Sequence, residues 1–179
     1  MVSVTSGSIT KGVILSQAFW NVYNLVNTRS NVDDPHPDGA SGKRKFVYSR
    51  EPKTSALSFK GYPFVIIHPA KTNFSRRNLS RTFAQVDWEM IVEVRSADTF
   101  RSEDIATDPQ GAGLSWLDGI SDDVLEAFNS RTNKNTLETY GMYFVSPEVG
   151  SVDTIETENE VVYVREIRLG FRNALLTVN

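Results

Sequence analysis

The chain has 179 residues, of which 40% are hydrophobic and 23% are charged, and its formal net charge is −3. These values fit one globular domain with a buried core, and the acidic balance argues against a surface that grips nucleic acid over its whole area. The absence of cysteine excludes disulfides, thiolate catalysis and cysteine-bound zinc.

The N-terminal residues 1–9 are rich in Ser, Thr, Gly and Val, and we expect them to form a flexible arm. Their polar start lacks the pattern of a signal peptide. A helix is predicted over residues 10–26, because Thr10 is a suitable N-cap and apolar residues recur every three to four positions. Its aromatic residues predict packing against the core or against a neighbouring subunit: Phe19, Trp20 and Tyr23.

A long polar loop is predicted over about residues 29–45, which contain two prolines and two glycines and show no periodicity. Loops of this length in compact domains are usually functional, so we expect this one to order against a partner. Short strands are predicted at residues 46–48 and 62–68.

The clearest strand covers residues 83–95, where apolar and polar side chains alternate. One face carries the carboxylates of Asp87, Glu89 and Glu93. A second helix is predicted over residues 114–129. Strands follow at 140–145, 152–157 and 161–171, the last two as a hairpin. This order predicts a single α+β domain over residues 1–179, with a mostly antiparallel sheet and two helices packed on one face.

Residues suited to catalysis are few. His36 lies in the polar loop and His68 ends a strand, and neither belongs to a metal-binding or catalytic motif. Alternating positions on a strand place side chains on one face about 7 Å apart, close enough to share magnesium as in a nuclease. The alternative is a solvated strand face whose charges discourage unwanted pairing. No lysine occurs between Lys71 and Lys134, which disfavours a nuclease, and we expect no enzyme activity, metal or cofactor.

Two basic clusters are candidate contact surfaces. Basic residues beside aromatic ones suit either phosphates or an acidic surface of another subunit, and the acidic chain favours the second. A solvated loop without a partner is the third interpretation of either cluster. The candidate subunit-interface residues are Lys43, Arg44, Lys45, Arg76, Arg77 and Arg81. No apolar run approaches the ~20 residues that span a bilayer, so no membrane partner is expected.

Five segments together carry a resemblance to a known family. They are SQAFWNVYNLV (16–26), YPFVIIH (62–68), TFAQVDWEMIVEV (82–94), LSWLDGISDDVLEAF (114–128) and VVYVREIRLGF (161–171). In the order and length of these elements, the chain resembles the tail terminator, or tail-completion, proteins of long-tailed bacterial and archaeal viruses. It also resembles related neck and minor tail proteins. The likeness covers nearly the whole chain.

The resemblance implies a virion protein, assembled in the host cytoplasm, that forms a ring of about six copies on the head-proximal end of the tail tube. The ring ends tube polymerisation and joins the tail to the head connector, and DNA passes through its lumen without specific binding. In such a ring Asp87, Glu89 and Glu93 are candidate lumen-facing acids. A tail-tube, neck or baseplate adaptor subunit is the main alternative, and a metal-dependent nuclease is a weaker one.

Overall fold

The computed structural model describes residues 11–40, 44–53, 61–76, 83–99, 112–158 and 160–177. The predicted arm (1–9) therefore lies outside the described residues, as do Lys43, Arg77 and Arg81. The helices are α1 (Lys11–Val26), α2 (Pro37–Ala40), α3 (Ala112–Asn129) and α4 (Arg131–Thr139). The strands are β1 (Val47–Tyr48), β2 (Phe64–Arg76), β3 (Phe83–Ala97), β4 (Met142–Glu156) and β5 (Val161–Thr177).

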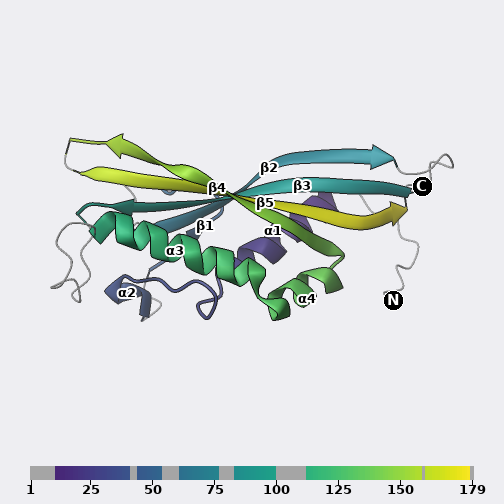
Figure 1. The fold of residues 1–179 in the computed structure, drawn as a ribbon, viewed down its shortest axis with the longest axis horizontal. Helices are drawn as coiled ribbons and strands as arrows, with labels where there is room; N and C mark the ends of the chain where they lie inside the picture. The colour runs from purple at the N-terminus through teal and green to yellow at the C-terminus, as the bar shows by residue number, and fades with distance from the viewer. Residues whose placement is uncertain are drawn as a thin grey trace.

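The five strands form one twisted sheet in the order β1-β2-β3-β5-β4, and the helices cover one of its faces (Figure 1). The pairs β2–β3, β3–β5 and β4–β5 are antiparallel. The predicted α+β class and the C-terminal hairpin are confirmed. The sheet is mixed rather than uniformly antiparallel, because β1 runs parallel to β2 after a crossover through residues 49–63.

The prediction of two helices is wrong. Three helices of nine residues or more are present in the described part of the chain, together with the four-residue α2 inside the predicted loop. Helix α4 has the sequence RTNKNTLET, in which Leu137 is the one buried residue. With a single apolar anchor it has no periodic pattern, so nothing in the sequence predicts an element there.

The helix-facing side of the sheet forms the core. From β3 and β5 it receives alternate side chains such as Met90, Val92 and Leu169, and α3 contributes Phe128. Phe128 and Phe144 each pack against Phe171, at ring-centroid distances of 6.0 and 5.6 Å. Burial of each such side chain stabilises the fold by roughly 1.5–3 kcal/mol. The core thus fixes one face of β3 and leaves the other available for contacts.

None of the described helices is long and apolar enough to cross a membrane. Glu51 and Tyr62, which precede β2, lie on the face opposite the helices. There Tyr62 stacks on Phe64 at 5.2 Å, and Glu51 accepts hydrogen bonds from Arg95.

Candidate assembly surface

The open face of the sheet, opposite the helices, carries ordered charges. The structure places Asp87, Glu89 and Glu93 together on this face, as the alternation in β3 predicts. Asp87 Oδ1 lies 3.0 Å from Arg172 Nε, and Glu89 Oε1 lies 3.3 Å from Arg168 Nη1.

Glu93 is also paired, with Arg95 from its own strand, and Arg95 in turn pairs with Glu51. Burial lowers the pKa of Arg95, but the hydrogen bond and charge of Glu93, with those of Glu51, outweigh it and raise the pKa. The open face therefore carries a network of ion pairs rather than a set of unpaired acids. The pairing of Arg168 and Arg172 with the acids of β3 is not visible in the sequence, because the alignment of β5 against β3 depends on register.

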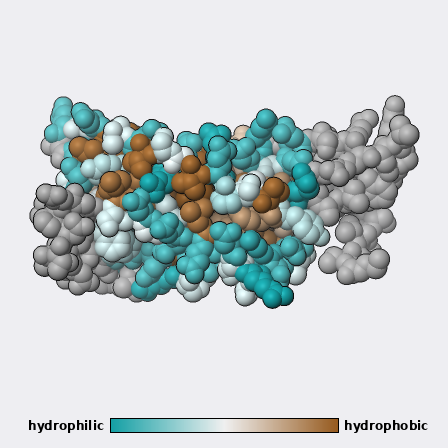
Figure 2. Space-filling view, viewed as in Figure 1, coloured by the Kyte–Doolittle hydropathy of each residue, from teal (hydrophilic) through white to brown (hydrophobic). Residues whose placement is uncertain are grey.

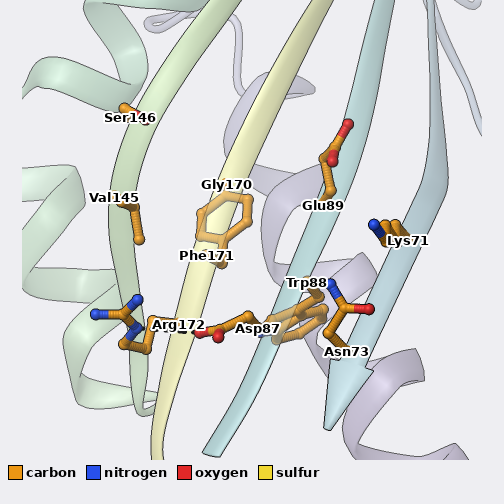
Figure 3. Close-up of a pocket in the computed structure, with 10 residues that line it drawn as sticks. All are labelled: Lys71, Asn73, Asp87, Trp88, Glu89, Val145, Ser146, Gly170, Phe171 and Arg172. Carbon is orange, nitrogen blue, oxygen red and sulfur yellow. Dashed lines mark hydrogen bonds and ion pairs between the residues drawn. The ribbon is translucent and has the colours of Figure 1, made fainter. Parts of the chain in front are cut away.

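A shallow hollow of about 280 Å³ opens on this face around Gly170 (Figure 3). Lys71, Asp87, Glu89 and Arg172 lie around it, and Ser146 is its one hydroxyl among the lining residues. A Cβ at Gly170 would lie 3.6 Å from the carbonyl oxygen of Ser146, which is ordinary contact, so packing does not require glycine there. No histidine lines the hollow, and its serine has no adjacent base of the kind that nucleophilic catalysis uses.

The two histidines lie in different parts of the fold. His36 Nδ1 accepts a hydrogen bond from the backbone N–H of Asp38, 3.0 Å away, in the loop at α2. His68 lies on the open face beside Ile91. Within the described residues, no group of three or more His, Asp or Glu side chains is placed to hold a metal ion.

A second polar hollow lies between the loop that joins α1 to α2 and the junction of α3 with α4. Asp33, Asp123 and Glu126 line it together. Burial raises the pKa of Asp123; a backbone N–H from Asp33 lowers it, and the charges of Glu126, Asp33 and Asp122 raise it. Arg29 neutralises Asp33 at 2.9 Å. No local sequence pattern predicts this group, since its members come from separate segments.

The predicted basic interface residues fall in different environments. Arg44 is 1% exposed in its side chain and pairs with the buried Asp34 at 2.6 Å, so it is bound inside the chain rather than presented to a neighbour. Lys45 is exposed and lies 5.1 Å above the ring of Tyr48. Arg76 ends β2.

The edge strand β4 is the most open part of the sheet. It has fifteen residues and pairs only with β5 in the described structure. Four of its large apolar side chains are 43–57% exposed: Tyr143, Val145, Val149 and Ile155. Figure 2 shows apolar side chains reaching an otherwise largely hydrophilic surface in separate groups. Edge strands with such side chains pair readily with other chains.

No protein-family model matches the chain, and a search of curated proteins finds no significant relative.

Proposed function

We propose that this chain is a virion structural subunit that forms a ring at the head-proximal end of a viral tail tube. In this role it ends tube polymerisation and joins the tail to the head connector. The observation that carries the proposal is the exposed edge strand β4, which carries four large apolar side chains and whose outer side pairs with no strand among the described residues. An edge of this length needs a partner or a protective cover.

The charged open face supports a structural role. Asp87, Glu89 and Glu93 are each engaged by an arginine, so they do not form the free carboxylate pair that a magnesium-dependent nuclease needs. If this face lines the lumen, its compensated charges would let DNA pass without tight binding, since net positive charge is what holds phosphates.

Ring closure follows from contacts between unlike surfaces. A head-to-tail contact repeated around an axis closes into a ring when the rotation allows, and otherwise extends as a filament. The partners proposed for the finished ring are other copies of this chain, the tail-tube protein and the head connector.

Negative-stain imaging of the purified chain tests this role. Discrete rings support a terminator, whereas long cylinders would reassign the chain as a tube protein. The edge variant Val145→Asn/Ile155→Asn should abolish the rings, and Leu114→Asn, at a 39% exposed position on α3, should keep them. Magnesium-dependent DNA cleavage that Asp87→Ala removes would contradict the proposal.

A further inference from the structure

The two edges of the sheet differ in charge. The segment from Met142 to Glu158, which includes the whole of β4, contains no lysine, arginine or histidine. Its exposed acids form no ion pair in the described part of the chain: Glu148, Asp153, Glu156 and Glu158. This edge is therefore acidic as well as apolar.

The opposite edge is basic. β1 pairs only with Val65 and Ile66, so β2 has no outer partner strand from Ile67 onward among the described residues. Exposed Lys45 and Arg50 flank β1, and exposed Lys71 lies on the free part of β2. Glu51, next to Arg50, pairs with Arg95 at 2.6 Å, and Glu89, opposite Lys71, pairs with Arg168 at 3.3 Å.

Strand direction permits these two edges to meet. Because β2–β3, β3–β5 and β5–β4 are all antiparallel, β4 runs opposite to β2. If a second copy is placed beside the first with the same orientation, its β2 lies antiparallel to β4. Antiparallel pairing at an edge continues the sheet from one copy to the next.

The register aligns the opposite charges. His68, Ile91, Arg168 and Glu148 lie at one level across the sheet. A neighbour placed without offset along the strands therefore brings its His68, and the nearby Lys71, beside Glu148.

Asp153 of β4 lies at the same level as Phe64 of β2, because Asp153 is opposite Val164, Val164 is opposite Arg95, and Arg95 is opposite Phe64. Val47 of β1 is level with Val65, the next residue of β2, so Lys45 lies toward the level of Asp153. The bulge between Val149 and Val152 lies at the level of β1, where the outer strand of the neighbour changes from β1 to β2.

We propose that the acidic β4 edge of one copy binds the basic β1–β2 edge of the next copy, head to tail, so that the sheet continues across the contact. This inference rests on the proposed function, because it names the surfaces through which the subunits of the ring meet.

Charge reversal on each edge tests the contact. The variants Glu148→Lys/Asp153→Lys and Arg50→Glu/Lys71→Glu should each raise the concentration for half-assembly by at least about ten-fold, because each sets like charges against each other. An equimolar mixture of the two, or all four changes in one chain, should restore assembly. Asp122→Lys/Glu138→Lys makes the same charge change on exposed helix positions and should leave assembly unchanged.

Cysteine pairs give a second readout, since the natural chain has no cysteine. The double variant His68→Cys/Glu148→Cys, at positions that the register places opposite each other, should form a ladder of disulfide-linked oligomers on oxidation. A link within one chain is excluded, because β2 and β4 lie three strand spacings, about 14 Å, apart. The single variant Glu148→Cys should stay unlinked, and efficient dimers from it would show that β4 pairs with itself.

The outcomes separate the two proposals. Rings that persist in both charge-reversal variants would overturn the edge contact and leave the ring intact. A cysteine ladder that appears in open filaments, without rings, would uphold the contact and overturn the terminator role. A wild-type chain that remains monomeric, together with a double-cysteine variant that gives no ladder, would contradict both.

Discussion

At the scale of single residues, Arg44 shows how position decides the role of a charge. Its guanidinium donates to Asp34 Oδ2 at 2.6 Å, to the carbonyl oxygens of Gly61 and Tyr62 at 3.4 Å, and to that of Pro63. It thereby ties the segment before β1 to the chain entering β2. Lys45, next in sequence, remains on the surface.

Replacement of Arg44 by alanine should therefore be costly. It leaves the Asp34 carboxylate buried without its partner, and such losses are about 3–5 kcal/mol in unfolding free energy. Denaturant unfolding would measure this, with Lys45→Ala as the control, expected within about 0.5 kcal/mol of wild type. A loss below about 1 kcal/mol for Arg44→Ala would contradict the structural role.

Asp123 predicts how the stability of the folded chain depends on pH. Its pKa in the folded chain is raised above the ordinary value, first by burial, so the folded state binds a proton more tightly than the unfolded state. Stability from this group is therefore present below the ordinary pKa and declines as pH rises through the raised pKa.

Asp123→Asn keeps the acceptor for the Asp33 N–H and removes the charge, and should raise the melting temperature at pH 7 by about 1–2 °C. The gain should shrink toward pH 4, as measured by thermal scans at several pH values. Glu138→Gln is the exposed control. An unchanged or lower melting temperature for Asp123→Asn at pH 7 would show that the buried charge of Asp123 does not destabilise the folded chain.

At the scale of elements, two glycines in α3 have opposite surroundings. A Cβ on Gly113 would lie 2.6 Å from the carbonyl oxygen of Ala97, where the start of α3 approaches the end of β3. Nothing lies within 4 Å of a Cβ on Gly119. The first glycine permits close packing of helix on strand, and the second only weakens the helix.

Gly119→Ala should accordingly stabilise the fold by about 0.5–1 kcal/mol, the usual helix-propensity difference. Gly113→Ala should destabilise it by about 1–3 kcal/mol, as overpacking does. Parallel denaturation curves of the two variants measure the contrast, and equal shifts in the same direction would refute the proposed packing of α3 on β3.

The elements also show how far the sequence alone reaches. Alternation in β3 predicts its two faces correctly, because one face must enter the core. The strands predicted at 140–145 and 152–157 are one strand, β4. Pro147 and Gly150 suggest a turn between them. On this edge strand, however, Pro147 stays paired opposite Leu169 and Gly150 falls in the bulge between Val149 and Val152, so the pairing continues.

The sequence predicts the acids of the open face but not the arginines that pair with them, because that pairing depends on contacts between distant segments. Asp87 and Glu89 follow from periodicity within one strand, whereas their partners Arg172 and Arg168 depend on the alignment of β5, which is separated by about 80 residues. The burial of Arg44 likewise depends on contacts with residues 61–63. Local pattern carries no information on such long-range contacts.

At the scale of the whole molecule, charge complementarity between the edges predicts salt-dependent assembly. Raising the ionic strength from about 0.05 to 0.5 M shortens the screening length to about 4 Å. The concentration for half-assembly should then rise severalfold, as measured by analytical ultracentrifugation. Assembly that strengthens with salt would point to a contact dominated by the apolar side chains of β4.

Closed assembly is the central claim, and light-scattering mass across a wide range of protein concentration tests it most directly. One chain has a mass of 20.1 kDa. A ring of about six copies predicts one species of roughly 121 kDa that stays constant in mass above its threshold concentration. A mass that grows continuously with concentration, or that remains at the monomer value throughout, would contradict the account.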